Sequence, residues 1–166
     1  MKSFTYAMLF ALTGAFASGC ATQKVVDAPN TTLGSVVVYK NGVAYFERYA
    51  APHEKELSLN VPGGRVDDFL KSLSIVDEAT GEALPVSYPT VASIDGEVKM
   101  TIALPAQHGR LRITYVTETP AWKPTYRVVL EDEAARLHGW AIGDNVSGED
   151  WEHVRLGVGS TAALSF

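Results

Sequence analysis

Short runs of β-branched and aromatic residues, separated by turn dipeptides, constrain this fold more than any other sequence feature. Asn41-Gly42 and Asp95-Gly96 each stand between two such runs. Asn-Gly and Asp-Gly are typical of tight hairpins, because both of their residues accept positive φ angles. The sequence therefore predicts two hairpins, and the flanking runs span residues 36–39, 43–49, 91–94 and 98–104.

The remaining patterns add further strands and a single helix. Apolar residues alternate with polar ones over 56–62, 111–115 and 126–130, which is the period of a half-buried strand. Val66, Phe69, Leu70 and Leu73 instead follow helical spacing, which indicates a short amphipathic helix at about 64–74. We expect a mainly β domain, an antiparallel sandwich or barrel-like fold that carries this one helix.

The first twenty residues have the order of a bacterial export signal. Lys2 precedes an apolar stretch over 4–16 that is too short to span a bilayer, and small residues follow it. The stretch 17–20, Ala-Ser-Gly-Cys, resembles the lipobox of bacterial lipoproteins, with Ala17 in place of the usual Leu. We expect residues 1–19 to be a signal peptide and Cys20, the sole cysteine, to be acylated and anchored in the membrane. Cys20 as an ordinary unpaired thiol is the alternative.

The expected organisation is a tether followed by one domain. Residues 20–33 carry no helical or alternating pattern, so they are expected to form the lipidated N-terminus and tether. Residues 34–166 are expected to form a single β-rich domain. Ala21, not Asp, follows the cysteine. By resemblance to the sorting signals of lipoproteins in Gram-negative bacteria, this predicts a location in the outer membrane.

Charge argues against nucleic acid as a partner. The chain has 14 Lys and Arg residues against 19 Asp and Glu residues, which gives a net charge of −5. No run of five like charges occurs, whereas a phosphate backbone is bound by clustered Lys and Arg. A protein or glycan of the cell envelope is the expected partner instead.

Four stretches resemble successive motifs of the mucoidy-inhibitor-like family, in the N-terminal part of its domain of unknown function. They read VVVYKNGVAYFERYA, VDDFLKSLSIVD, RITYVTETPAWKPTYRVVL and GWAIGDNVSGEDWEHVRLGV. The likeness begins at about Ser35, and family members continue beyond the position of Phe166, so the domain is expected to be incomplete at its C-terminus. The resemblance implies no catalytic residue, because the family has none established.

Two aromatic turn elements carry much of this likeness. In the first, Trp122, Pro124 and Tyr126 precede or begin a strand; in the second, residues 148–151 read Gly-Glu-Asp-Trp. We expect Trp122, Pro124, Tyr126 and Trp151 to be structural anchors, with both indoles buried. Ser147 and Asp150 fit a capping box around a single helical turn, with Trp151 fixing that turn to the core.

Residues for catalysis or metal binding form no motif. His53, His108, His138 and His153 lack the spacing of a zinc site, and neither a nucleophile elbow nor a phosphate loop occurs. We therefore expect no cofactor, no metal and no catalytic residue. A non-catalytic binding domain is the first hypothesis, and a hydrolase-like envelope enzyme with an unrecognised site is the alternative.

The last strand-like run completes the predictions. Val154, Leu156 and Val158 alternate, and we expect residues 154–158 to form an edge strand that lacks its next neighbour. Such an edge leaves backbone amides and carbonyls unpaired, with Arg155 as the one charged residue to protect it. This predicts self-association or the binding of a peptide by strand addition.

Overall fold

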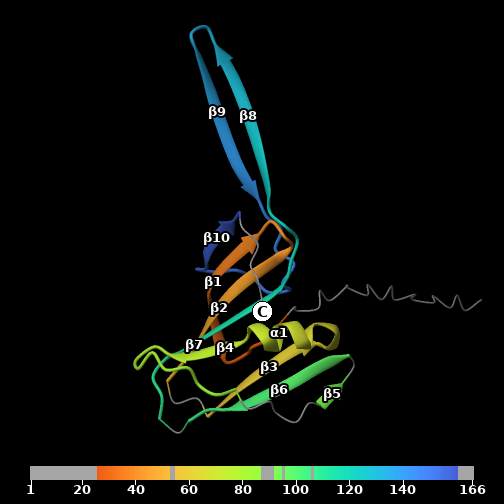
Figure 1. The fold of residues 1–166 in the computed structure, drawn as a ribbon, viewed down its shortest axis with the longest axis vertical. Coiled ribbons are helices and arrows are strands. Elements are labelled where there is room, and N and C mark those ends of the chain that lie inside the picture. Colours follow the sequence, from red (N-terminus) through yellow and green to blue (C-terminus); the bar gives the residue numbers. More distant parts are fainter. Residues whose placement is uncertain (1–25, 53–54, 87–91, 95, 106, 161–166) are drawn as a thin grey trace, which may run out of the picture.

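The fold is mainly β, as predicted, and contains one short helix (Figure 1). The structure is a computed structural model that describes residues 26–52, 55–86, 92–94, 96–105 and 107–160. Its elements are β1 (Thr31–Tyr39), β2 (Val43–Ala50), β3 (Glu56–Pro62), η1 (Gly63–Arg65), α1 (Val66–Ser72), β4 (Ser74–Asp77), β5 (Ala92–Ile94), β6 (Glu97–Ala103), β7 (Leu111–Glu118), β8 (Lys123–Glu131), β9 (Ala134–Ile142) and β10 (Arg155–Gly159). The predicted signal peptide and Cys20 lie outside the described residues.

Both predicted hairpins form. β1 and β2 are antiparallel, and the connection between them ends in Gly42, whose φ angle of 82° is a conformation that glycine adopts without strain. β5 and β6 pair in the same way around Gly96, which has a φ angle of 81°. Asp95 lies outside the described residues.

The largest sheet has the strand order β10-β1-β2-β7-β4. β1 with β2, β2 with β7 and β7 with β4 all pair antiparallel. β10 instead pairs parallel with β1, from Ser35 opposite Arg155 to Tyr39 opposite Gly159. β10 lies at the edge of this sheet, as expected, although the sequence did not predict its parallel direction. No closed barrel is formed, and the described part of the chain contains two further, separate sheets.

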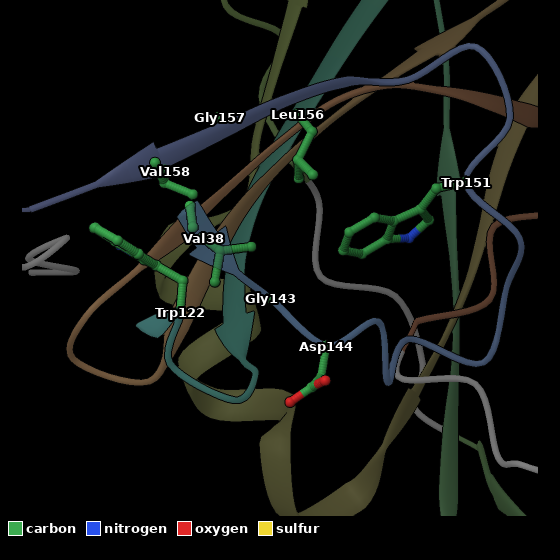
Figure 2. A pocket seen from close by; sticks show the side chains of 9 residues that line it. Val38, Trp122, Gly143, Asp144, Trp151, Leu156, Gly157 and Val158 are labelled. Atoms are coloured by element: carbon green, nitrogen blue, oxygen red, sulfur yellow. The ribbon is translucent and has the colours of Figure 1, made fainter. Parts of the chain in front are cut away.

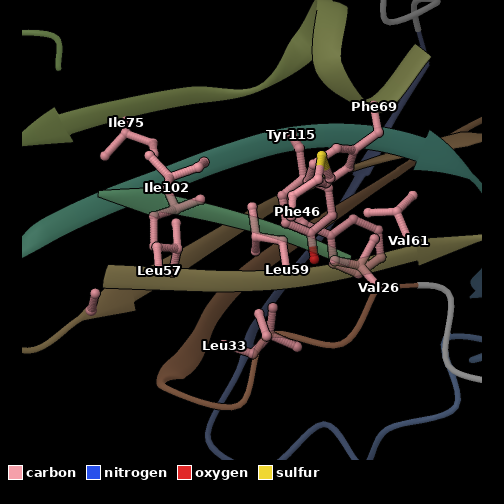
Figure 3. Packing of buried hydrophobic residues seen from close by; sticks show 14 of the residues in the cluster. Val26, Leu33, Phe46, Leu57, Leu59, Val61, Phe69, Ile75, Ile102 and Tyr115 are labelled. Atoms are coloured by element: carbon pink, nitrogen blue, oxygen red, sulfur yellow. The ribbon is translucent and has the colours of Figure 1, made fainter. Parts of the chain in front are cut away.

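The core lies between the largest sheet and a second sheet of order β3-β6-β5. Leu57, Leu59 and Val61 of β3 point inward toward Phe46 and Tyr115 of the first sheet (Figure 3). Helix α1 adds Phe69, which is 1 % exposed and lies 4.9 Å from the Tyr115 ring. The two sheets and the helix therefore share one continuous hydrophobic core, so the sandwich form of the prediction is the correct one.

The packed domain begins earlier than the predicted tether allows. Val26 and Ala28 are buried in the core, and Asp27 forms a backbone bridge with Asn60. β1 then begins at Thr31, not after residue 33. The part of the predicted tether from 26 to 33 therefore belongs to the domain, because its small apolar residues add to the core edge without any periodic pattern.

The third sheet contains β8 and β9 alone and stands out from the rest of the molecule (Figure 1). Every residue of both strands is exposed. Pro124 and Tyr126 lie here, with Tyr126 66 % exposed, so their predicted role as structural anchors is wrong. Their strand alternates as predicted, but no other element of the part of the chain that the structure describes covers it. We call the hairpin formed by residues 123–142 the arm.

Candidate functional site

The arm has one face that is apolar along its whole length. In an antiparallel pair, directly opposite residues point to the same side, and alternate pairs share a face. The register places four apolar pairs on one face, namely Pro124 with Ala141, Tyr126 with Gly139, Val128 with Leu137 and Leu130 with Ala135. Leu130 is 81 % exposed and Leu137 66 %. A continuous exposed apolar strip of this kind marks an interaction site in a natural protein.

The opposite face of the arm is mixed, because it holds the basic residues of the arm together with Val129, Trp140 and Ile142, which are 39 %, 49 % and 50 % exposed. It carries Arg127 opposite His138 and Val129 opposite Arg136. Arg136 forms an ion pair with Glu131 at 3.2 Å, and the ring of His138 stacks on Trp140 with centroids 6.0 Å apart. The arm thus has one apolar face, which no other described element covers, and one mixed face that holds its basic residues.

An apolar pocket lies at the base of the arm (Figure 2). Its volume is about 360 Å³, and it is lined by Val38, Trp122, Ala141, Gly143, Asp144, Trp151, Leu156, Gly157 and Val158. Ala141 also belongs to the apolar face of the arm, so pocket and face form one continuous surface. Leu156 and Val158 of β10, 60 % and 48 % exposed, extend this surface over the edge of the largest sheet.

The two predicted tryptophan anchors are both walls of this pocket, and both are half-buried rather than fully buried. Trp122 donates a hydrogen bond from Nε1 to the carbonyl oxygen of Gly159, at 2.8 Å, and so ties the start of the arm to β10. Trp151 packs edge-on against Phe46 of the core, with centroids 6.4 Å apart. Each indole therefore both contacts the folded domain and lines the pocket.

Residues 147–149 form a bend, and the rest of 144–151 has no regular structure, so the predicted helical turn is absent. The reason is Asn145, whose side-chain oxygen accepts hydrogen bonds from both the backbone nitrogen and the hydroxyl of Ser147, at 3.0 and 2.7 Å. Ser147 in turn accepts the indole N–H of Trp151 at 3.0 Å. Asp150 is exposed, and no helical turn is present for it to cap.

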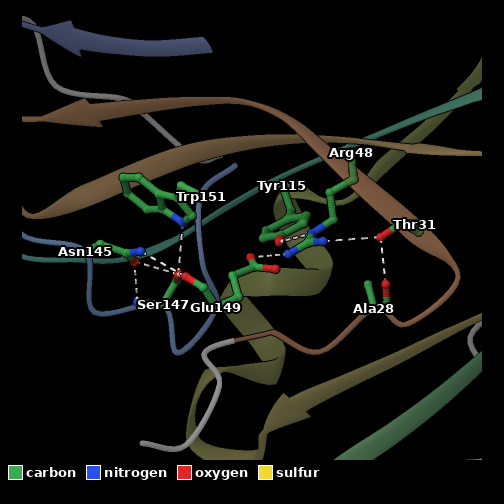
Figure 4. Close-up of polar contacts among 8 residues, drawn as sticks. All are labelled: Ala28, Thr31, Arg48, Tyr115, Asn145, Ser147, Glu149 and Trp151. Atoms are coloured by element: carbon green, nitrogen blue, oxygen red, sulfur yellow. Dashed lines mark hydrogen bonds and ion pairs between the residues drawn. The ribbon is translucent and has the colours of Figure 1, made fainter. Parts of the chain in front are cut away.

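Beneath the pocket, Arg48 joins the connecting loop to the core (Figure 4). Its guanidinium is 2 % exposed, donates from Nε to the hydroxyl of Tyr115 at 2.9 Å, and pairs with the carboxylate of Glu149. A third hydrogen bond runs from Nη1 to the hydroxyl of Thr31, at 3.3 Å, which donates to the carbonyl of Ala28. One buried cation thus links the N-terminal segment, β2, β7 and the loop that leaves the arm.

The charge states of this network follow from its burial. Burial raises the pKa of Tyr115 to about 12, against the opposing effect of Arg48, so the phenol stays protonated at neutral pH. Burial acts to lower the pKa of Arg48, but Tyr115 and Glu149 outweigh it, and the net pKa is raised. Arg48 therefore stays charged and acts as a structural cation, not as a proton donor.

The sequence interpretation missed Arg48, although a signal for it exists. Ala44, Phe46 and Ala50 are the inward positions of β2, and Arg48 follows the same alternation. A lone cation at an inward position of such a strand requires a buried partner. The apolar face of the arm was missed for a similar reason, because the β9 positions of that face are small or aliphatic and give a weak pattern on their own.

The described residues bring no catalytic constellation together. His108 lies beside Gly109, His138 lies on the arm, and His153 lies in the loop before β10, while His53 is outside the described residues. Among the described residues, no three His, Cys, Asp or Glu side chains lie close enough to hold a metal ion. Within the same ranges, no helix has the length and apolar character needed to cross a membrane.

Comparisons with family models, with curated proteins and with solved structures give no match to this chain.

Proposed function

We propose that this chain is a non-catalytic, lipid-anchored interaction module of the bacterial cell envelope, and that the apolar face of the arm is its binding surface. The observation that supports this is the uncovered row of apolar pairs from Pro124/Ala141 to Leu130/Ala135, which ends in the pocket. Exposure of such an apolar face to water is unfavourable, so its burial by a partner stabilises the complex. The resemblance to the mucoidy-inhibitor-like family, which has no established catalytic residues, agrees with a binding role.

The pocket favours binding over hydrolysis. Asp144 is the one ionisable residue among the described residues that line it, whereas general acid and base work needs two groups or a nucleophile with its base. The other lining side chains are aliphatic or aromatic, as in a site that holds an apolar group by exclusion of water.

Acylation of Cys20 would hold this binding surface close to the outer membrane. Val26 is already part of the core, and the six peptide steps from Cys20 span at most about 20 Å. The domain would therefore lie next to the bilayer instead of at the end of a long tether. Confinement to a surface raises the effective concentration of partners that share it.

Site-specific photocrosslinking in intact bacterial cells tests the proposal. The full chain carries a benzophenone amino acid in place of Tyr126 or Leu137, on the apolar face, or in place of Arg127 or Arg136, on the opposite face. We expect protein adducts from the two apolar-face positions and few from the two controls, because the faces differ in chemistry but share one ribbon.

The adducts should sediment with the outer membrane, and Cys20→Ser in the same chains should move them to the soluble fraction. Equal labelling from both faces, or adducts with lipid alone, would contradict the proposed binding surface. Adducts that stay in the membrane fraction when Cys20 is replaced would contradict the anchor.

A further inference from the structure

We infer that the partner of the arm is a second copy of this chain, with the two arms packed face to face and antiparallel, so that Leu130 at each tip enters the pocket at the base of the other arm. This inference rests on the proposed function, because it names the partner of the same apolar surface. Three features of the arm support this inference: the shape of its apolar face, the charges at its two ends and its length.

The shape of the apolar face is complementary to a second copy of itself when the two arms are antiparallel. Near the base, Pro124 pairs with the small Ala141, which lines the pocket, whereas at the tip the larger side chain of Leu130 is 81 % exposed. In the middle, Gly139 has no side chain and lies under the Tyr126 ring, which a Cβ there would meet at 3.4 Å. Antiparallel packing sets the projecting tip against the low base, while parallel packing sets Leu130 against Leu130 and leaves both pockets empty.

Charges at the two ends of the arm select the same direction. The turn at the tip holds Glu131, Asp132 and Glu133, and Arg136 pairs with the first of them. At the base, the Lys40 ammonium lies 5.0 Å from the ring centroid of Trp122. Parallel arms would place two acidic turns together, whereas antiparallel arms place each acidic turn beside the Lys40 side of the partner's pocket.

Asp144 also lines the pocket and is an acidic group at the base of the arm. In Figure 2 its carboxylate points away from Trp151 and Leu156. The Lys40 ammonium over the Trp122 ring is the cation on the Trp122 side of the pocket. The side of the pocket formed by Trp122 is therefore the side that suits the acidic turn.

The charges argue against a lipid surface as the occupant. Elements that lie on membranes place basic side chains beside their apolar face, where they reach anionic headgroups. Here Arg127 and Arg136 lie on the opposite face, and the tip that would lead an insertion carries three acidic residues in succession, Glu131 to Glu133. The cation beside the apolar surface thus lies at the base, and the tip is acidic, which is not the charge distribution of a membrane-binding ribbon.

The size of the face sets the expected affinity. Each strand has nine residues, which at ~3.3 Å per residue makes a ribbon roughly 30 Å long and about 10 Å wide. Its area is well below the ~800 Å² per partner of a standard stable interface, even before the pocket contact is added. We therefore expect a weak dimer that forms when the chains are concentrated on a membrane surface.

Short-range thiol crosslinking between two differently tagged full chains in the same cells tests this geometry. One chain carries Leu130→Cys and the other carries Val158→Cys, so a product that contains both tags joins two molecules. We expect this pair to react with a short bis-maleimide several-fold more than the matched pair of Val129→Cys with Val158→Cys, because residue 129 adjoins residue 130 but lies on the opposite face. Chains without an introduced cysteine give the background from Cys20.

A charge exchange supplies the second measurement. Asp132→Lys alone and Lys40→Glu alone should each lower the yield of the crosslinked pair. The two changes in one chain should restore it, because each tip then meets a base of the opposite sign. A structural effect of either change would not be rescued by the other.

The outcomes separate this inference from the proposed function. Adducts from Tyr126 that contain a different protein, with no pair formed by Leu130→Cys and Val158→Cys, would overturn the dimer and leave the binding surface standing. Strong crosslinking of Leu130→Cys with itself would overturn the antiparallel direction. Absence of protein adducts from the apolar face would overturn both proposals.

Discussion

Arg48 shows how one buried residue can tie the loop between β9 and β10 to the core. The guanidinium is almost fully buried, and its three partners come from β1, β7 and the loop between β9 and β10. A buried cation without its counterion is costly, so the loop cannot detach without exposing or orphaning the charge. The position of Glu149 therefore depends on the core.

Removal of the carboxylate should test this dependence. Glu149→Ala leaves Arg48 buried with a neutral phenol and a hydroxyl, and we expect a loss of about 2–3 kcal/mol, at the lower end because the Glu149 side chain is 21 % exposed. Urea unfolding of the variant gives this free energy. Glu152→Ala, in the same loop but exposed, should change stability by less than ~0.5 kcal/mol. Equal effects of the two substitutions would contradict the role of the ion pair.

At the scale of the element, the end of β4 depends on one carboxylate. Asp77 accepts hydrogen bonds from the backbone nitrogens of Gly109 and Ala79, at 2.9 and 2.8 Å. These bonds join the turn after β4 to the segment that leads into β7. The bonds from Gly109 and Ala79, in that order, lower the pKa of Asp77 from its ordinary value of 3.8.

This shift predicts a specific acid sensitivity. Because the folded-state pKa is lowered, the contribution of Asp77 to stability is fully present above the unfolded-state value of 3.8 and is lost as pH falls through the folded-state pKa. Asp77→Asn should therefore be less stable than the natural chain at neutral pH, and the difference should shrink below about pH 4. Thermal melts from pH 7 to pH 2 measure this, with Glu82→Gln as a control at the exposed end of the turn. A difference that is constant with pH would contradict the assignment.

At the scale of the whole molecule, the sequence predicts the elements better than it predicts their partners. The hairpins at Gly42 and Gly96 and the helix that buries Phe69 depend on local signals, and these elements form. The parallel pairing of β10 with β1 joins residues more than a hundred positions apart, which no local pattern encodes. Alternation in β8 looks the same whether a core covers Val128 or not, so the exposed arm could not be recognised from its own residues.

The resulting molecule has two regions of different stability. β2 and β7 each have a strand on both sides and surround the core, whereas, within the described chain, β8 and β9 have only each other. Two-stranded hairpins are marginal in water without a covered face. The arm should therefore open without unfolding of the domain, while the central strands exchange their amide hydrogens only through global unfolding.

Native-state hydrogen exchange in low urea separates these routes. Amides of β8 and β9 should exchange at a lower free energy than those of β2 and β7, and with little urea dependence, because local opening exposes little new surface. Their protection should rise with protein concentration if a second copy covers the apolar face, while that of β2 and β7 should stay constant. Leu130→Asp should remove the concentration dependence but not the difference between arm and core. Protection of the arm equal to that of β2 and β7 at every concentration would show that arm and domain unfold as one unit.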